Sequence, residues 1–158
     1  MDITIKNDKY RFGVRVGAII LNRDENKILV QKQNKIDEYI IPGGRLNILE
    51  DTQYAITREL DEELGIVNEE VRLKYIIESN IKNKYHEIGF YYIVVIDEIK
   101  YNINDGFKSL DLNEDESLFK WIDIDKLNNY ELLINCLGEK IISRDYRNNS
   151  VEHIIYKK

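Results

Sequence analysis

The segment PGGRLNILEDTQYAITRELDEELGI (Pro42–Ile66) decides the fold and function class of this 158-residue chain. It opens with a Gly-Gly turn and closes with four carboxylates, Glu59, Asp61, Glu62 and Glu63. Helical residues three and four positions apart share a face, so Glu59, Glu62 and Glu63 are predicted to converge. Three like charges at that distance repel one another, and hard cations such as Mg²⁺ prefer carboxylate ligands. The segment therefore predicts a metal site on a helix.

The spacing of the polar residues is more specific than their composition. It runs Gly44, five residues, Glu50, seven residues, then RELxEExGI from Arg58 to Ile66. An acidic helix alone is usually a solvated face, but the glycine pair and Glu50 at these offsets favour a functional site. The pattern resembles the Nudix box, the signature of hydrolases that cleave nucleoside diphosphates linked to another moiety. The resemblance implies one Nudix hydrolase domain over residues 1–158, with an α/β fold built as an α/β/α sandwich around a mixed β-sheet.

The resemblance also implies a reaction and a cofactor. A member of this family is expected to hydrolyse a diphosphate linkage in a nucleoside diphosphate derivative, a small-molecule nucleotide substrate, with Mg²⁺ or Mn²⁺ as the cofactor. Metal ions can neutralise the phosphates and activate the attacking water. The residues that carry over, with their implied roles, are Glu59, Glu62 and Glu63 as catalytic metal ligands, Gly43 (through its carbonyl) and Glu50 as further metal-site residues, and Arg58 as the residue that orients the glutamates.

A further acidic ligand or base is common beyond the box in such proteins. We favour Glu116, which precedes the segment FKWI, and the other candidates are Glu114 and Glu87. The ordinary interpretation of the stretch DLNEDE is an exposed acidic loop.

Two arginines are candidates for substrate contacts. Arg15 lies inside an otherwise apolar segment, where an unpaired charge is costly. It is expected either to reach a substrate phosphate or to pair with a carboxylate. Arg45 adjoins the glycine pair and is expected either to contact a phosphate or to lie on the surface.

The bulk composition excludes several function classes. The net charge of −6 disfavours binding to duplex nucleic acid, which needs a basic face. Cys136 is the only cysteine, so no intrachain disulfide forms. No apolar run reaches membrane-spanning length and the N-terminus lacks a signal-peptide core, which predicts a soluble, cytoplasmic protein that binds no membrane. Homodimers are common for such folds, and no sequence feature decides this point.

Hydrophobic periodicity predicts the order of the elements. The helix of the box is expected to begin near Asp51 or Thr52, to bury Ala55, Ile56, Leu60 and Leu64, and to end at Gly65. Strands are predicted at 12–21, 27–33, 38–41, 71–79, 85–97 and 118–122. Residues 100–117 are predicted as loop, a helix is predicted from Asp125 through Asn135 or beyond, and the tail 151–158 is open between a short strand and a helical turn.

Other functions on the same scaffold are open. A Nudix-fold sensor would bind a nucleotide without cleaving it, although such modules tend to lose box carboxylates. An isomerase would need a catalytic cysteine, and Cys136 lies far downstream. A decapping enzyme would prefer a basic groove, which the acidic balance does not support. Substrate specificity is expected to reside outside the box, in residues 34–38, 80–86 and 103–117.

Overall fold

A computed structural model of the chain describes residues 1–112 and 116–158. Its strands are β1 (Thr4–Lys6), β2 (Arg11–Asn22), β3 (Lys27–Gln33), β4 (Gly43–Arg45), β5 (Arg72–Ile81), β6 (Tyr85–Ile96), β7 (Phe107–Lys108), β8 (Ser117–Asp123) and β9 (Glu152–Lys157). Its helices are α1 (Thr52–Leu64), α2 (Glu98–Tyr101) and α3 (Asn135–Ile142), with short 3-10 turns η1 (Ile124–Asn129) and η2 (Asp145–Arg147).

In the described residues, one mixed sheet contains all nine strands, in the order β7-β8-β3-β2-β6-β5-β9, with β1 and β4 paired to β2. The pairs β2–β6 and β5–β9 are parallel, and the other pairs are antiparallel. The long strand β2 pairs along its whole length with β6, and it also pairs with β1, β4 and β3 at successive positions along its length. This arrangement places the box beside the centre of the sheet.

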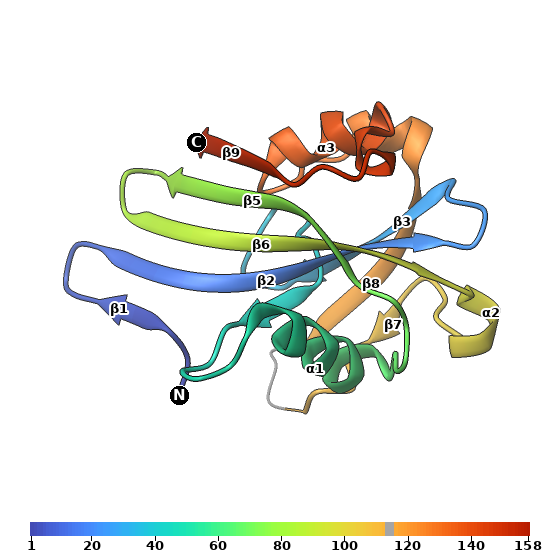
Figure 1. Ribbon diagram of the computed structural model, residues 1–158, viewed down its shortest axis with the longest axis horizontal. Coiled ribbons are helices and arrows are strands. Elements are labelled where there is room, and N and C mark those ends of the chain that lie inside the picture. Colours follow the sequence, from blue (N-terminus) through green and yellow to red (C-terminus); the bar gives the residue numbers. More distant parts are fainter. Residues whose placement is uncertain (113–115) are drawn as a thin grey trace.

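The two faces of the sheet carry separate hydrophobic cores. One core packs α1 against β2 and β6 through residues such as Val16, Ala18 and Ile56. The other packs η1, α3 and η2 against the opposite side chains of the same strands, including Ile19 and Leu21. Figure 1 shows α1 and α3 on opposite sides of the sheet. The predicted α/β/α sandwich is confirmed.

Helix α1 forms where the capping signals of the sequence place it. Asp51 is the N-cap, and its side chain accepts a hydrogen bond from the backbone N–H of Tyr54 at 2.8 Å. Gly65 ends the helix with a φ of 66°, a left-handed conformation that glycine adopts without steric cost. The four predicted apolar positions, Ala55, Ile56, Leu60 and Leu64, are all buried. The bounds and the buried face of this helix are as predicted.

The strand predicted at 38–41 is wrong, because the regular ladder forms after Pro42. Residues 39 and 40 make only isolated bridges, whereas Gly43–Arg45 pairs with β2. The carbonyl of Pro42 accepts a hydrogen bond from the N–H of Ala18 at 2.8 Å. Proline has no N–H to donate, so it takes part in the strand pairing only through this carbonyl. A side chain on Gly43 would lie 2.8 Å from the Cα of Gly17. Only glycine allows β4 to approach β2 this closely.

Two further predictions in the C-terminal half are corrected. The helix from Asp125 through Asn135 is instead the 3-10 turn η1, an extended stretch, and then α3. The extended stretch exists because the N–H of Leu133 donates to the carbonyl of Tyr39 and the N–H of Tyr39 donates to Glu131. The predicted loop 100–117 contains the short strand β7, paired with β8, and the tail forms β9.

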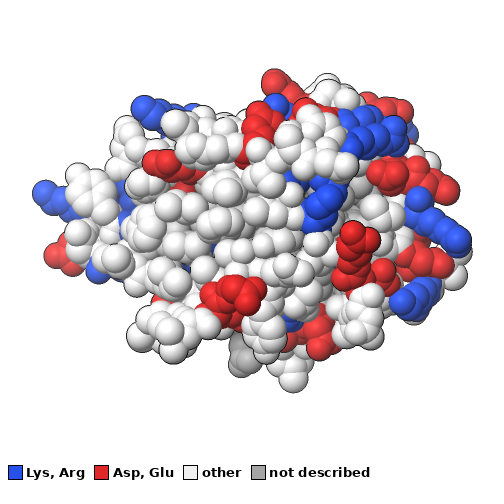
Figure 2. Space-filling view, viewed as in Figure 1, with Lys and Arg blue, Asp and Glu red and all other residues white. Residues whose placement is uncertain are grey.

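Charge is unevenly distributed over the surface. Figure 2 shows mostly uncharged side chains in the middle of the face that presents β5, β6 and β2, with charged groups gathered toward the margins. The net charge of the chain therefore says little about any particular face. Within the part of the chain that the structure describes, no helix combines the length and apolarity needed to span a membrane.

Candidate active site

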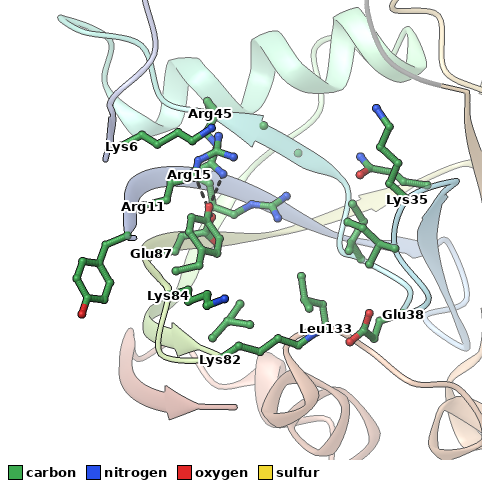
Figure 3. A pocket seen from close by; sticks show the side chains of 18 of the residues that line it. Lys6, Arg11, Arg15, Lys35, Glu38, Arg45, Lys82, Lys84, Glu87 and Leu133 are labelled. Carbon is green, nitrogen blue, oxygen red and sulfur yellow. Dashed lines mark hydrogen bonds and ion pairs between the residues drawn. The ribbon is translucent and has the colours of Figure 1, made fainter. Parts of the chain in front are cut away.

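A cavity of about 980 Å³ brings the box together with residues far away in the sequence. Its wall contains the glycine elbow, defined here as Gly43 and Gly44, together with Glu59 and Glu62 of α1. Arg15 of β2, Arg45 of β4 and two hairpins at one end of the sheet complete it (Figure 3). The volume is in the range of small-molecule sites.

Arg58 compensates the acidic residues of the box. Its Nε donates to Oε1 of Glu50 at 2.6 Å and its Nη2 donates to Oε2 at 3.1 Å. Its Nη1 donates to Glu59 at 2.8 Å and to Glu62 at 3.0 Å. The hydrogen bonds from Arg58 hold the pKa of Glu50 below its usual value, and Glu50 in turn raises the pKa of Arg58. The predicted orienting role of Arg58 therefore has a physical basis in these contacts.

Glu59 and Glu62 converge, but Glu63 takes a different position. The Glu63 side chain is buried, with 2% of the residue exposed, and contributes to the core side of α1. Burial alone would lower the pKa of Arg15, but its pKa is raised by the neighbouring groups Tyr91, Glu87 and Tyr85, and last by Glu63. Glu63 is not among the residues that line the cavity. The three glutamates do not share one group of oxygens.

The glycine elbow makes room for the Glu59 carboxylate. A Cβ built on Gly44 would lie less than 3.0 Å from all three carboxyl atoms of Glu59, a separation that real Cβ atoms essentially never show. The φ of Gly44 is not positive, so backbone conformation does not require glycine here. The requirement is for space, and it fixes the Glu59 carboxylate directly against the backbone of the elbow.

A polar cluster surrounds Arg45, the residue that follows the glycine elbow on β4. The guanidinium of Arg45 lies 3.3 Å from the carboxylate of Glu87 and also bonds the hydroxyl of Tyr85, which donates to Glu87. Burial raises the pKa of Tyr85 to about 12, and the neighbouring Glu87 adds to this shift. Glu87 is 4% exposed. Arg15 donates to the carbonyl of Ile41 at 3.1 Å, and its Nε has no hydrogen-bond partner among the described residues.

The fit of a divalent cation rests on the donor set. Within the described residues, no group of three or more His, Cys, Asp or Glu side chains is placed to hold a metal ion. Glu59 nevertheless offers its carboxylate oxygens beside the backbone of the glycine elbow, and Glu62 shares the Nη1 of Arg58 with it. Mg²⁺ binds typically through one or two carboxylates, with waters and substrate phosphates completing its shell. The residues present fit such a cation once Arg58 gives way to it at Glu59 and Glu62.

The NUDIX domain family matches residues 11–138, which is most of the chain and includes both the cavity strands and the box. The chain belongs to the NUDIX domain family. The predicted family is confirmed, and membership supports the predicted class of enzyme, a Nudix hydrolase acting on phosphoric anhydride bonds. No curated protein matches the chain.

Solved structures share the Nudix fold with this chain at low sequence identity. A MutT NUDIX hydrolase from Burkholderia pseudomallei is 23% identical with a TM-score of 0.63, covering 83% of this chain and 98% of that one. An ADP-ribose pyrophosphatase from Streptococcus suis is 15% identical with a TM-score of 0.57, covering 90% and 98%. The NUDIX domain of Shewanella oneidensis NrtR, complexed with ADP ribose, is 14% identical with a TM-score of 0.63, covering 90% and 91%.

Only some of the remaining predicted site residues of this Nudix protein line the cavity. Arg15 and Arg45 both line it, as does Glu87. The described residues that line the cavity do not include Glu50, Glu63 or Glu116. Glu116 is exposed just before β8, in agreement with the ordinary interpretation of an acidic loop. Glu114 lies outside the described residues.

Sequence reasoning identified two of the cavity segments and missed another. Residues from 34–38 and 80–86 line the cavity as predicted for specificity segments, whereas the segment 103–117 contributes Asp111 among its described residues. The missed segment is 6–11, the turn between β1 and β2. Its sequence, KNDKYR, looks like an ordinary polar turn, and only the pairing of β2 with β6 brings it beside residues 82–85.

Proposed function

We propose that the protein hydrolyses a diphosphate linkage in a nucleoside diphosphate derivative with the help of Mg²⁺ or Mn²⁺. The observation that carries the proposal is the contact between the glycine elbow and Glu59, within a cavity that also contains Arg15 and Arg45. The arginines, which can bind phosphate, and the glutamate, which can bind a cation, therefore line the same cavity. The ADP-ribose pyrophosphatase of similar fold supports the same class of substrate.

The chain's residues have distinct proposed roles. Glu59 and Glu62 hold the cation together with the carbonyl of Gly43, and when bound the cation supplies charge neutralisation and a water of lowered pKa. Glu50 keeps Arg58 in place through a bidentate ion pair, so that Arg58 can release Glu59 and Glu62 without leaving the site.

Arg45 and Arg15, which pair on the neighbouring strands β4 and β2, contact the substrate phosphates, and Glu87 orients Arg45. Glu63, which is buried on α1 next to Glu62, is proposed as the base that accepts a proton from the attacking water. Glu116, which is exposed just before β8 and is not part of the cavity wall, is retained as the proposed further acidic residue.

The proposal is tested with purified protein and a panel of nucleoside triphosphates, ADP-ribose, dinucleoside polyphosphates and sugar nucleotides, assayed with and without Mg²⁺. We expect turnover that requires the metal and falls at least a hundredfold in Glu59→Gln and in Glu63→Gln. The exposed substitution Glu139→Gln in α3 is the matched control, and it should retain wild-type turnover. Absence of metal-dependent turnover across the panel contradicts the proposal.

A sensor that binds without cleaving is the second candidate. The observation that favours it is the position of Arg58, which already forms ion pairs with Glu50, Glu59 and Glu62 within the described structure. A site built this way could bind a nucleotide with no bound cation. Calorimetric binding of ADP-ribose together with no product formation, at any Mg²⁺ concentration, would support the sensor over the hydrolase.

A further inference from the structure

One side of the cavity is assembled from three segments that lie far apart in the sequence. The segments that contribute lining residues to it are 35–38 between β3 and β4, 81–82 at the β5–β6 turn, and Leu133 before α3. We call them together the Leu133 wall. Figure 3 shows Glu38, Leu133 and Lys82 along this side of the cavity, away from Arg45. The shape of the wall therefore depends on contacts that hold these three segments to one another.

The Leu133 wall brings apolar side chains to the cavity. Among the described residues, four large aliphatic side chains line the cavity, and three of them, Ile36, Ile81 and Leu133, belong to this wall. Small-molecule sites bind the uncharged part of a ligand through apolar walls. A substrate whose diphosphate contacts Arg15 and Arg45 would therefore place the moiety linked to the diphosphate against the Leu133 wall.

Lys158, which follows β9, contacts all three parts of the chain that form this wall. Its Nζ donates to Oε1 of Glu38 at 2.9 Å and lies 3.5 Å from the carboxylate of Glu131, in the stretch that leads to α3. Its backbone N–H donates to the carbonyl of Asn80 at 2.9 Å, and its own carbonyl accepts from the N–H of Lys82 at 2.7 Å. Lys158 thus connects the three segments, although it is not among the residues that line the cavity.

The contact between Lys158 and Glu38 is partly sheltered from water. The two side chains are 22% and 15% exposed. The hydrogen bond from Lys158 lowers the pKa of Glu38, and the charge of Lys82 adds to this effect, so the carboxylate is charged at neutral pH. The same loop is anchored from β3, where the Nζ of Lys32 donates to the carbonyl of Ile36 at 2.7 Å. The Lys158 contact is the anchor that also reaches the other two segments.

We propose that Lys158 is a positioning residue of the site, which holds Glu38 and thereby fixes residues 35–38 against the rest of the Leu133 wall, so that the wall fits the moiety linked to the diphosphate. This inference rests on the proposed function for the place of the diphosphate at Arg15 and Arg45. Loss of the Lys158 contact should raise KM and leave kcat nearly unchanged, because the wall binds the ground state and the transition state equally.

Calorimetry with ligands that carry or lack the linked moiety tests the proposal. The probes are ADP-ribose, ATP, GTP, CTP and UTP, together with inorganic pyrophosphate, which offers nothing to the Leu133 wall. At least one nucleotide should bind wild-type protein about tenfold more tightly than pyrophosphate. Lys158→Gln should weaken the binding of that nucleotide about fivefold and change the binding of pyrophosphate by less than twofold.

Three further variants separate a positioning role from a general loss of stability. Lys158→Arg keeps the positive charge and should retain most of the affinity. Glu38→Gln should reproduce the loss, and its combination with Lys158→Gln should add little, because both changes remove the same contact. Lys140→Gln is the matched control, since it breaks a 2.7 Å ion pair with Glu152 that also ties β9 to the fold, at residues that do not line the cavity. It should keep wild-type affinity.

Hydrogen exchange in the wild-type protein gives a measurement that needs no variant. The bound nucleotide should slow exchange of the backbone amides in 35–38, whereas pyrophosphate should not. The inference is overturned by nucleotides that bind no more tightly than pyrophosphate, or by exchange in 35–38 that no nucleotide changes. It is also overturned if Lys158→Gln weakens pyrophosphate and nucleotide equally, or if Lys140→Gln causes the same loss.

Binding and turnover together separate this inference from the proposed function. If Lys158→Gln selectively loses nucleotide affinity but no compound is hydrolysed with Mg²⁺, the positioning role stands and the hydrolase proposal fails. If hydrolysis occurs and the KM of Lys158→Gln equals that of the wild type, the proposed function stands and this inference fails.

Discussion

Replacement of Gly44 by alanine tests the contact that joins the elbow to the acidic helix. The new Cβ would overlap the Glu59 carboxyl group, which must retreat by about 1 Å to reach the 3.4 Å where ordinary contact begins. A displacement of about 1 Å at a reacting site can cost roughly a hundredfold in rate. We therefore expect kcat/KM in Gly44→Ala to fall by about two orders of magnitude.

The stability of Gly44→Ala should change far less than its activity. Weakening the hydrogen bond between Arg58 and Glu59 costs about 1–2 kcal/mol, because both groups are charged and partly buried. Alanine in a strand recovers about 0.5–1 kcal/mol relative to glycine. The net change in the free energy of unfolding should lie within about 1 kcal/mol, measured by urea denaturation.

The same substitution elsewhere in the chain provides the control. A Cβ on Gly138 of α3 would lie 3.7 Å from Leu132, an ordinary contact, so Gly138→Ala should keep full activity. If Gly44→Ala acts through Glu59, it should cause little additional loss in a Glu59→Gln background. Wild-type turnover in Gly44→Ala, or fully additive losses in the double variant, would refute the assigned position of Glu59.

Three further predictions concern single residues. Leu49 is fully exposed with a φ of 66°, so Leu49→Gly should raise the free energy of unfolding by about 0.5–1 kcal/mol in thermal denaturation, whereas Leu49→Ala should not. Because Arg58 lowers the pKa of Glu50 in the folded protein, Glu50 stabilises the fold above its unfolded pKa and loses this effect as the pH falls. The difference in unfolding free energy between wild type and Glu50→Gln should thus shrink between about pH 5 and pH 3, and a constant difference would contradict the ion pair. Burial raises the pKa of the Cys136 thiol to about 11, so its alkylation at pH 8 should be roughly a hundredfold slower than that of free cysteine, and should accelerate on unfolding.

The sequence predicted local features better than long-range ones. Helix α1 follows from a cap at Asp51, a stripe of apolar residues and a terminal glycine, all of which act within a few residues. The continuous helix expected after Asp125 does not form, because Tyr39, some ninety residues earlier, pairs with the backbone at Leu132. Periodicity carries no information about such a partner.

In the candidate site, too, the sequence predicted local features better than long-range ones. The convergence of Glu59 and Glu62 follows from helical spacing, but the burial of Glu63 depends on how closely α1 packs against β2. Net charge suggested an acidic surface without a basic groove, whereas strand pairing gathers Arg11 and Lys84 into one cavity. An average over the chain cannot reveal a cluster that is assembled by the sheet.

An anomalous difference map from a crystal soaked with Mn²⁺ and a non-hydrolysable nucleotide tests the central claim most directly. The account predicts a peak within direct ligand distance of Glu59 and Glu62, with Arg58 still paired to Glu50 and the diphosphate against Arg45. A bound nucleotide without a peak at these carboxylates, or a peak at a different group of residues, would contradict it.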